Sequence, residues 1–426
     1  MTATLVALIN GAAAGTVTCG PHIRLSFAYD ERWIVSPNAI ALSLSLPLGV
    51  RNHRHDAITA FLWGLLPDNE QTLERWARQF QVSPRNPFSL LTHVGEDCPG
   101  AVQFATPERA RELSGPAPSQ IAWLTPKQIA ERLRALHNDP SLWRRPGDIG
   151  QFSLAGAQPK IALLKQGRRW GIPSGRTPTT HILKPPIAGF DGHAENEHFC
   201  LNLARRLGLP VCVSEVRRFD DQPVIVVTRF DRVAPNGEIV RVHQEDLCQA
   251  MGLLPSANYQ NQEGATPEQI VTLLRSNSSA AQDDIQTFVA ALAYNWIIGG
   301  TDAHAKNYAL LHGSGGRIRL APLYDVASVL PYPGIDAKRA KLAMKIGDTY
   351  EMEAIGPRQW RKFAEANKLK PDETLEAVGQ MIRATPDAVE AEMAACQAEG
   401  LDHPVLGKLA EIVRHRARKL ARGWAS

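Results

Sequence analysis

The heptapeptide TDAHAKN occupies residues 301–307 and is followed by the dipeptide YD at 324–325. Asp302 and Asn307 lie five positions apart, and Asp325 comes after a segment with the pattern of a short hairpin. This Asp-x-x-x-x-Asn…Asp order is typical of phosphoryl-transfer catalytic loops, in which the first Asp orients a substrate hydroxyl and accepts its proton. The Asn and the later Asp hold Mg²⁺ on the nucleotide phosphates. The stretch therefore predicts an enzyme that transfers phosphate.

The segments on either side of this loop predict rigid elements that hold it in place. The apolar run FVAALAYNWIIGG at 288–300 is long enough for a buried helix, and YALLHG at 308–313 has the composition of a strand. GSGG at 313–316 predicts a turn, after which RIRLAPLYDV at 317–326 returns as the second strand of a hairpin. A helix and a hairpin together would keep the three side chains in fixed positions.

Two other interpretations of the loop stay open at this level. Asp and Asn are common in turns, so one Asp-x-x-x-x-Asn also arises without any catalytic role. His304 suggests a metal site with Asp302 and Asp325, but no His-x-x-x-His pair nearby supports zinc. A His in a polar loop is more often a hydrogen-bonding residue than a metal ligand.

A second group of residues has the features of a phosphate-binding half-site. SLAGAQPK at 153–160 is a loop of small residues between two strand-like runs, at 149–154 and 160–165. Small residues let backbone N–H groups approach phosphate oxygens closely. The loop holds one Gly and matches no glycine-rich motif, so a plain hairpin turn is the alternative. THILKPP at 180–186 predicts a strand that ends in Lys184, which would either reach phosphate or stay solvated.

The order of the elements is more informative than any one of them. AENEHFCLNLARRLGL at 194–209 has helical spacing, and PVIVVTRFDR at 223–232 is a β-branched strand running into a connector. A phosphate loop, a lysine strand, a helix, a hinge strand, a long helical region and the catalytic loop follow one another between 150 and 325. This series matches the layout of a kinase.

At these residues the chain resembles the HipA family, the Ser/Thr kinases of bacterial toxin–antitoxin pairs. The matching stretches are SLAGAQPK (153–160), PTTHILKPP (178–186), ENEHFCLNLARRLGL (195–209), TRFDR (228–232), HQEDLCQAMGL (243–253), GGTDAHAKNYALL (299–311), PLYDVAS (322–328) and KLAMKIG (341–347). Two upstream stretches, LWGLLPDNEQ (62–71) and FSLLTHVGEDCPGAVQF (88–104), extend the resemblance over nearly the whole chain.

The resemblance implies a role for each motif. Asp302 and Asn307 would be catalytic, Asn307 and Asp325 would hold Mg²⁺, and Asp231 would reach the ribose of ATP. The loop would cover the triphosphate, Lys184 or Lys160 would contact phosphate, and the backbone of 228–230 would bind adenine. The residues implied in nucleotide binding are Ser153, Leu154, Ala155, Gly156, Ala157, Gln158, Lys160, Lys184, Thr228, Arg229, Phe230, Asp231, His304, Lys306, Tyr324 and Asp325.

The resemblance also implies self-inactivation, because Ser153 matches the serine that family members autophosphorylate. A phosphate adds about −1.5 to −2 charges to a loop that should hold anionic ATP, and repulsion would expel the loop. The sequence departs from the family at Thr228, where some members carry an acidic residue. It departs again at Pro159, where a charged residue is frequent and Pro removes one backbone N–H.

The length of 426 residues allows two or three domains. We expect an α+β, two-lobed protein-kinase-like (HipA-like) fold with a mixed α/β N-terminal subdomain at 1–147, a kinase N-lobe at 148–230 and a mainly helical C-lobe at 231–426. Within the first subdomain, IALSLSLPL at 40–48 alternates like a strand. From 243 onward the pattern is helical apart from the hairpin at 308–320.

Composition favours a cytoplasmic protein. No uncharged apolar run reaches the roughly 18 residues of a membrane span, and the six Cys are scattered without a CxxC motif, as in a reduced protein. The net charge of +4 neither requires nor excludes nucleic acid. The C-terminal helix expected at 407–424 is basic, which indicates either a solvated face or a patch near DNA. Its cations are Arg414, His415, Arg416, Arg418, Lys419 and Arg422.

Three functions are consistent with the sequence. The first is a Ser/Thr protein kinase toxin that uses ATP and Mg²⁺ to phosphorylate a host protein, such as an aminoacyl-tRNA synthetase, and arrests growth. The resemblance then implies a HipB-like helix-turn-helix antitoxin as partner, and operator DNA through that antitoxin. The second is a catalytically weak HipA-like co-repressor that acts with the antitoxin. The third, a small-molecule phosphotransferase, is disfavoured by the extra N-terminal subdomain.

Overall fold

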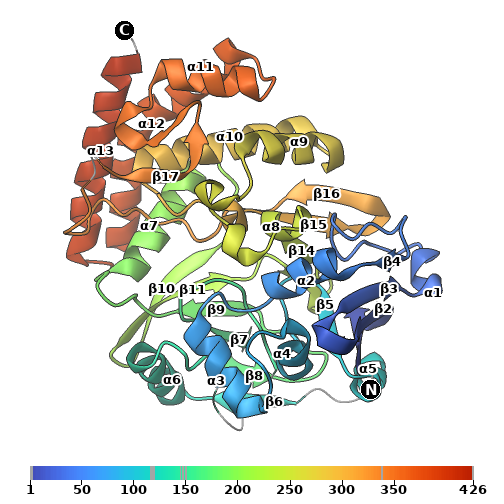
Figure 1. Ribbon diagram of the computed structural model, residues 1–426. Coiled ribbons are helices and arrows are strands. Elements are labelled where there is room, and N and C mark those ends of the chain that lie inside the picture. The colour runs from blue at the N-terminus through green and yellow to red at the C-terminus, as the bar shows by residue number, and fades with distance from the viewer. Residues whose placement is uncertain are drawn as a thin grey trace. The chain divides into compact units, whose positions relative to one another are not determined.

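The computed structural model describes residues 3–115, 120–143, 145, 148, 151–336 and 339–424. The chain divides into two compact units, each made of several segments (Figure 1). Unit 1 comprises Met1–Pro185, Arg218–Ser256 and Ala309–Ile318, and unit 2 comprises Pro186–Arg217, Ala257–Tyr308 and Arg319–Ser426. The ranges expected as N-terminal subdomain and N-lobe thus fall into unit 1, apart from 186–217. Most of the range expected as C-lobe falls into unit 2.

Unit 1 begins with an antiparallel five-stranded sheet in the order β4-β3-β2-β1-β5. Its strands are β1 (Ala3–Ile9), β2 (Ala12–Cys19), β3 (Leu25–Tyr29), β4 (Asn52–His53) and β5 (Val102–Ala105). Asn10 and Gly11 both have positive φ (50° and 82°), the geometry of the two-residue turn that the hairpin of β1 and β2 requires. The helices of this part are α1 (Glu31–Ile34), α2 (His55–Gly64), α3 (Glu70–Phe80), α4 (Pro87–Val94) and α5 (Pro107–Ser114).

The strand expected at 40–48 is not formed, apart from one isolated pairing between Ser43 and Leu46. The Leu46 N–H donates to the Ser43 carbonyl (3.0 Å), and the Ser43 hydroxyl accepts from the Ser45 N–H (3.0 Å). Local serine hydrogen bonds compete with a sheet ladder, and here they close a turn instead. The prediction from alternation was therefore wrong.

A second sheet of unit 1 has the order β10-β11-β9-β7-β8-β6. Its strands are β6 (Ile121–Leu124), β7 (Ile161–Gln166), β8 (Arg169–Pro173), β9 (His181–Lys184), β11 (Gln222–Thr228) and β10 (Ser214–Phe219), along which the chain passes from unit 2 into unit 1. α6 (Pro126–Asn138) packs against β6 and β11. The expected strands at 160–165, 180–186 and 223–232 are thereby confirmed as β7, β9 and β11.

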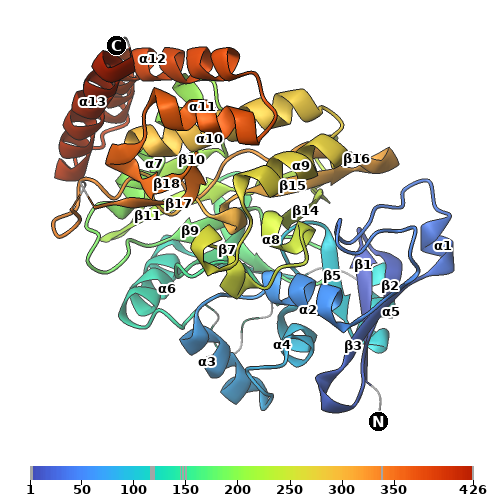
Figure 2. The ribbon, with the colours of Figure 1, turned by 45° about the horizontal axis from the view of Figure 1, so that its top comes forward.

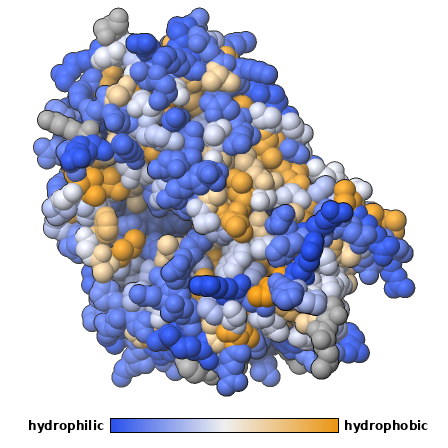
Figure 3. All heavy atoms as spheres, viewed as in Figure 1, coloured by the Kyte–Doolittle hydropathy of each residue, from blue (hydrophilic) through white to orange (hydrophobic). Residues whose placement is uncertain are grey.

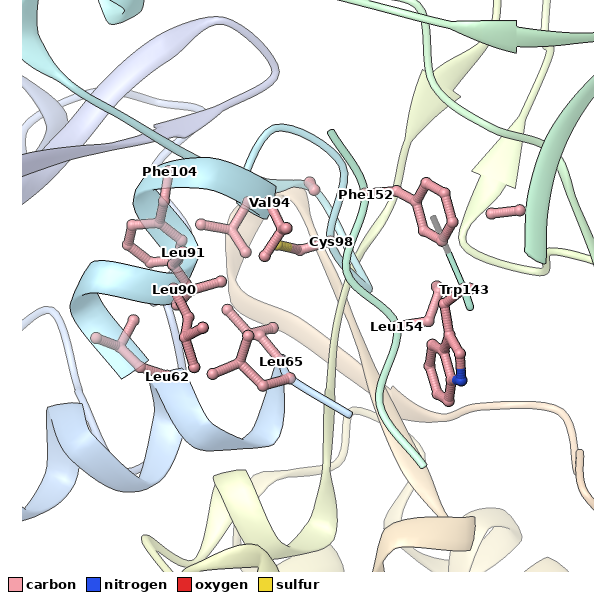
Figure 4. Packing of buried hydrophobic residues seen from close by; sticks show 14 of the residues in the cluster. Leu62, Leu65, Leu90, Leu91, Val94, Cys98, Phe104, Trp143, Phe152 and Leu154 are labelled. Carbon is pink, nitrogen blue, oxygen red and sulfur yellow. The ribbon is translucent and has the colours of Figure 1, made fainter. Parts of the chain in front are cut away.

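The two sheets of unit 1 share one hydrophobic core. Figure 4 shows Trp143, Phe152 and Leu154 beside residues of α2 and α4, and all belong to a single buried cluster. Phe152 is the only described residue of the run 149–154 that pairs like a strand, in an isolated bridge to Asp97, and residues 149–150 lie outside the described residues. The strand expected there is replaced by an irregular segment anchored by apolar side chains.

Unit 1 is completed by short strands that follow the hinge region. β12 (Arg232–Val233) pairs with β13 (Val240–Arg241), and β14 (His243–Asp246) pairs with β15 (Ala309–Gly313). α8 (Leu247–Ala250) follows β14, and β16 (Arg317–Leu320) carries the chain back into unit 2. The hairpin expected at 308–320 is confirmed as β15 and β16.

Unit 2 is mainly helical. Its helices are α7 (His193–Arg206), α9 (Pro267–Asn277), α10 (Ala281–Ile298), α11 (Pro357–Ala366), α12 (Pro371–Ala398) and α13 (Pro404–Trp424). α12 and α13 lie side by side, as Figure 2 shows, and α10 contacts both. The hairpin of β17 (Lys341–Ile346) and β18 (Thr349–Glu351) was not expected, because the chain after 243 reads as helical apart from 308–320.

The apolar helix expected at 288–300 is confirmed as α10, whose last residues are almost all buried. Among the described helices, none combines the length and the apolar character that a membrane crossing requires. The face drawn in Figure 3 is mainly hydrophilic, with hydrophobic residues in separate small groups. All six cysteines are free thiols.

Candidate active site

A pair of glycines connects α10 to the loop that carries Asp302. Gly299 ends the helix in the left-handed conformation (φ +73°), and its N–H donates to the Asn295 carbonyl. A Cβ on Gly299 would lie 2.4 Å from Leu330, and one on Gly300 would lie 2.3 Å from the Asn295 side-chain oxygen. Only glycine fits at both positions, so the chain turns sharply from a buried helix into the loop.

Hydrogen bonds within the loop hold Asn307 against Asp302. The Asn307 Nδ2 donates to the Asp302 carbonyl oxygen (2.7 Å), the His304 N–H donates to the same oxygen (2.8 Å), and the Asn307 N–H donates to the His304 carbonyl (2.9 Å). Because the amide nitrogen of Asn307 is used internally, its Oδ1 is the atom available to a metal. The Asp302 side chain is 65% exposed, so its carboxylate is accessible.

The segment that carries Asp325 is fixed to both ends of the same loop. Tyr324 donates its hydroxyl to the Lys306 carbonyl (2.7 Å), and Ser328 donates its hydroxyl to the Ile298 carbonyl (2.6 Å) at the end of α10. Leu323 pairs with Val211. Asp325 itself has a positive φ of 55°, a conformation rarely adopted by residues other than Gly, Asn and Asp. Unit 2 therefore holds Asp302, Asn307 and Asp325 on connected, well-anchored backbone.

The side chains of this loop suit magnesium rather than zinc. Mg²⁺ prefers oxygen ligands, commonly one or two carboxylates with phosphates and water, and Asn307 Oδ1 and Asp325 would supply two protein oxygens. Over the described ranges, no group of three or more His, Cys, Asp or Glu side chains could hold a metal ion on its own. His304 is largely buried, its Nε2 lies 3.9 Å from the Asp302 Oδ1, and its ring packs edge-on against Tyr259.

Tyr259 is a residue at this site that the sequence analysis missed. Its hydroxyl donates to the Asp302 carboxylate, and its ring centroid lies 4.8 Å from that of His304 at an interplanar angle of 81°. Burial, together with the hydrogen bond and charge of Asp302, raises the pKa of the Tyr259 phenol well above its usual value. The segment 255–265 reads as a polar loop, and its lone aromatic residue was the only available signal.

The small-residue loop lies in unit 1, held by the N-terminal part of the chain. The Ser153 N–H donates to the Asp97 carbonyl (3.0 Å), and the Ser153 hydroxyl donates to the Leu65 carbonyl (2.7 Å). The Asp68 N–H donates to the Gly156 carbonyl (3.1 Å), and Pro67 bridges to Gly156. Ser153 is fully buried in this arrangement. The segments 65–68 and 97 thus fix the path of the loop.

The Lys160 side chain folds back and contacts the loop 153–158 directly. Its Nζ donates to the Ala155 carbonyl (2.8 Å) and lies 5.6 Å from the ring centre of Trp143. Gly156 has φ +102°, and a Cβ there would lie 2.6 Å from Lys160 Nζ, so the one glycine of the loop is required. The Gln158 amide donates to the Pro185 carbonyl (3.3 Å). Leu154 is buried in the core of unit 1.

Lys184 and Thr228 lie on neighbouring strands of unit 1. Lys184 is the last residue of β9, is buried, and stands opposite Ile225 of β11, while Thr228 stands opposite His181. The Arg229 N–H continues this pairing with a hydrogen bond to the Thr180 carbonyl (2.9 Å). The strand that ends in a lysine and the strand that leads into the hinge are therefore directly paired.

Asp231 is enclosed by arginine side chains of unit 1. Its carboxylate is buried and accepts hydrogen bonds from Arg229 Nε (3.0 Å), Arg229 Nη2 (2.8 Å), Arg232 Nη1 (2.9 Å) and the Gly100 N–H (2.7 Å). Both oxygens are occupied by neighbours inside unit 1. The carboxylate thereby orders the segment 229–232 from within unit 1, and the ribose contact implied for Asp231 stays a prediction.

The same network contains Asp97, a second residue that the sequence analysis did not single out. Its carboxylate accepts from Arg232 Nη2 (2.9 Å), Arg241 Nη2 (3.3 Å) and the hydroxyl and N–H of Thr179 (2.6 and 3.0 Å). Burial alone would raise the pKa of Asp97, but the adjacent guanidinium groups of Arg232, Arg229 and Arg241 hold it well below its usual range. The network joins the turn after α4 to the hinge, all within unit 1.

The expected site residues are therefore distributed over both units. Unit 1 carries Ser153, Leu154, Ala155, Gly156, Ala157, Gln158, Lys160, Lys184, Thr228, Arg229, Phe230 and Asp231. Unit 2 carries Asp302, His304, Lys306, Asn307, Tyr324 and Asp325.

Comparison with known proteins adds independent information. Residues 152–389 match the family model of the HipA-like C-terminal domain, and residues 5–105 match that of the HipA N-terminal domain. Y4mE of Sinorhizobium fredii, which is named as a candidate kinase, is 36% identical over 391 residues, covering 89% of this chain and 91% of the relative. The serine/threonine-protein kinase toxin HipA of Shewanella oneidensis is 28% identical, covering 85% of this chain and 82% of the relative.

The fold has a close match among solved structures. A chain from the complex of Shewanella oneidensis HipA, HipB and operator DNA superposes with a TM-score of 0.84, at 23% identity, covering 99% of this chain and 98% of the other. This match confirms the expected α+β, kinase-like architecture. The model of the HipA-like C-terminal domain covers both the loop 153–160 and the loop 301–307.

Proposed function

Since the chain belongs to the HipA family of kinase-like toxins, we propose that it is a protein kinase that uses ATP and Mg²⁺ to phosphorylate serine or threonine in a host protein. The observation that carries the proposal is the connected arrangement of Asp302, Asn307 and Asp325 on anchored backbone in unit 2. The match to kinase relatives over most of the chain supports it. An aminoacyl-tRNA synthetase is one candidate target class.

The chemical step follows from these side chains. The Asp302 carboxylate orients the substrate hydroxyl and accepts its proton as the hydroxyl oxygen bonds to the γ-phosphorus of ATP. The bond from that phosphorus to the β,γ-bridging oxygen breaks, and ADP leaves with the electron pair. Mg²⁺ held by Asn307 Oδ1 and Asp325 would neutralise charge on the phosphates. The anchoring of the loop keeps Asp302 in position for the transfer.

Unit 1 would bind the nucleotide. The backbone of the loop 153–158 and the buried Lys184 are the proposed phosphate contacts, and the backbone of 228–230 is the proposed adenine contact. Lys160 supports the loop from inside, because its ammonium group is bonded to the Ala155 carbonyl. We therefore assign a positioning role to Lys160, and we keep Lys184 as the phosphate contact that the family resemblance implies.

Autophosphorylation of Ser153 would inactivate the enzyme. Ser153 is buried, and its hydroxyl points at the Leu65 carbonyl oxygen. A phosphate on this hydroxyl would place about two negative charges against a carbonyl oxygen in an apolar site, which is strongly unfavourable. The loop would have to leave its position to accept the phosphate and could not return while phosphorylated.

A HipB-like helix-turn-helix antitoxin and operator DNA are the proposed partners, since the matching solved structure is a complex of that composition. The exposed cations of α13 are proposed to contribute to DNA affinity. Lys419 lies near Glu353 (2.6 Å) and Arg414 near Glu390 (3.4 Å), but such exposed pairs contribute little. Charge on this helix favours the co-repressor as the second candidate function, with catalysis absent or weak.

One experiment separates the two functions. Wild type and Asp302→Asn are expressed in a bacterial host without antitoxin, and growth is followed; each is then tested with the antitoxin for operator binding. The kinase proposal predicts growth arrest with wild type only, and operator binding by both. Arrest by both proteins would contradict the role of Asp302. Arrest by neither, with operator binding intact, would favour the co-repressor.

A further inference from the structure

The base of the proposed kinase already has a hydroxyl partner from its own chain. The Tyr259 hydroxyl donates to Asp302 Oδ1, the hydrogen bond that an acceptor serine or threonine must make before transfer. Both residues belong to unit 2. The phenol therefore occupies, at Oδ1, a hydrogen-bonding position that a substrate hydroxyl would use, while the Asp302 side chain as a whole stays 65% exposed.

The segment that carries Tyr259 is held firmly against the catalytic loop. The Tyr259 carbonyl accepts from the N–H groups of Gln262 (2.9 Å) and Gly264 (3.0 Å), and the Ala305 N–H donates to the Asn258 carbonyl (3.2 Å). The side-chain oxygen of Gln260 accepts from the Lys345 N–H on β17 (2.7 Å). A Cβ on Gly264 would lie 2.5 Å from the Tyr259 carbonyl oxygen, so the turn depends on glycine.

The chemistry of the phenol suits an occupant better than a nucleophile. A tyrosine hydroxyl is protonated at neutral pH, and burial raises the pKa of Tyr259 further, so the hydroxyl donates a hydrogen bond and does not attack phosphorus. The edge-on contact with His304 fixes the ring beside the base. The phenol and the carboxylate are linked by a hydrogen bond, so a substrate hydroxyl can replace the phenol without breaking a covalent bond.

We propose that Tyr259 is a gate on the catalytic base, one that holds Asp302 while no acceptor is bound and is displaced by the substrate hydroxyl. The inference rests on the proposed kinase function. Its main consequence concerns water as a wasteful acceptor. If Asp302 were open, it would take a proton from water as the water oxygen bonds to the γ-phosphorus, and ATP would be lost as ADP and phosphate. The gate suppresses this hydrolysis.

The test is the initial rate of inorganic phosphate release from ATP in the presence of Mg²⁺, with purified full-length protein and no acceptor protein, because transfer to Ser153 forms ADP without releasing phosphate. Tyr259→Phe keeps the ring against His304 and removes only the hydroxyl. Its hydrolysis rate should rise about tenfold, the size expected for loss of one hydrogen bond to a charged acceptor. Tyr350→Phe, which removes a phenol hydroxyl from the β17–β18 hairpin, is the matched control and should hydrolyse ATP like wild type. Gln260→Ala, which loosens the segment at Lys345, should give a smaller rise.

Each outcome supports or overturns the gate. The rise must disappear in the double variant Tyr259→Phe/Asp302→Asn; if it persists, it does not act through the base. A Tyr259→Phe rate at or below wild type, with Asp302→Asn inactive, overturns the gate and leaves the kinase proposal standing. Phosphate found on Tyr259 itself would also overturn it, in favour of an acceptor role.

An Asp302→Asn protein as active as wild type would instead refute the base assignment. If Tyr259→Phe does not fold, Gln260→Ala alone decides.

Discussion

At the scale of single residues, Asp97 is the carboxylate that three buried arginines of unit 1 surround. Its carboxylate faces Arg232 and Arg241 directly, and Arg229 lies 3.5 Å away. All four side chains are nearly inaccessible to solvent. Removing one partner of a buried ion network leaves the others uncompensated in a medium of low dielectric constant, which is more harmful than losing an exposed pair. The network therefore orders the hinge while making unit 1 sensitive to single substitutions.

Asp97→Ala should destabilise the protein by about 3–5 kcal/mol, because three guanidinium groups lose a shared counter-charge. Urea unfolding followed by circular dichroism measures the change in the free energy of unfolding. The control is Asp221→Ala, which removes an exposed ion pair with Arg134 in the same unit. Its unfolding midpoint should stay close to that of wild type. Equal midpoints for the two variants would contradict the role of the network.

The buried His243 should make the free energy of unfolding depend on pH. It is fully enclosed, accepts from the Ala101 N–H and bonds to the Leu42 carbonyl, and burial, aided by the neighbouring His312, lowers its pKa to about 3. In the unfolded chain the imidazole of His243 has an ordinary pKa of about 6.5. It therefore binds a proton more readily there than in the folded protein. Stability from this group is therefore present above about pH 6.5 and falls as the pH drops toward 3, by up to about 1.4 kcal/mol per pH unit.

The measurement is the free energy of unfolding between pH 7 and pH 4 for wild type, His243→Gln and His22→Gln. His243→Gln should show a shallower loss of stability on acidification, although it will be less stable at pH 7. His22→Gln removes an exposed imidazole and should follow wild type. Identical slopes for wild type and His243→Gln would show that His243 does not carry the pH dependence.

At the scale of elements, the loop that follows Gln151 is built as an anchored segment. Phe152 and Leu154 lie in the core of unit 1 on either side of Ser153. Expelling Ser153 therefore means exposing two large apolar side chains and breaking the hydrogen bonds to 65–68 and 97. Burial of each such side chain stabilises the observed position of the loop by roughly 1.5–3 kcal/mol. The loop therefore keeps this position unless a charge is placed on the buried Ser153 side chain.

Ser153→Asp should abolish or strongly weaken ATP binding, because a carboxylate cannot take the buried place opposite the Leu65 carbonyl. Ser153→Ala, which leaves the loop seated, should bind ATP within a few-fold of wild type. Isothermal titration with a non-hydrolysable ATP analogue gives the dissociation constants, and limited proteolysis reports exposure of 152–158. Tight binding by Ser153→Asp with a protected loop would refute the link between loop position and nucleotide binding.

At the scale of the whole molecule, the N-terminal part is more than an appendage to the kinase-like domain. The range that matches the HipA N-terminal domain holds the loop 153–158, through Leu65, Asp68 and Asp97, and holds Asp231, through Gly100. These contacts lie inside unit 1. Binding of nucleotide by this chain should therefore depend on the integrity of the N-terminal sheet as well as on the motifs of the domain at 152–389.

Local patterns in the sequence predicted the helix α10 and the hairpin of β15 and β16, which bracket the loop 301–307. The roles of Asp302, Asn307 and Asp325 stay predictions, made from a helix, a loop and a hairpin that are adjacent in the chain. Tyr259 was not readable, because its contact with Asp302 spans 43 positions and depends on how a polar loop folds back. Asp97 and Asp231 form a network across more than 130 positions, so their burial could not be deduced from their neighbours in sequence. The strand expected at 40–48 failed because serine side chains satisfied the backbone locally.

In the proposed reaction this chain transfers the γ-phosphate of ATP with Asp302 as its base. The most direct test incubates purified, initially unphosphorylated protein with γ-labelled ATP and Mg²⁺, wild type beside Asp302→Asn, and maps the labelled sites by mass spectrometry. The account predicts label on Ser153 in wild type and none in the variant. Equal labelling of both proteins, or no labelling of a wild-type protein shown to bind ATP, would contradict it.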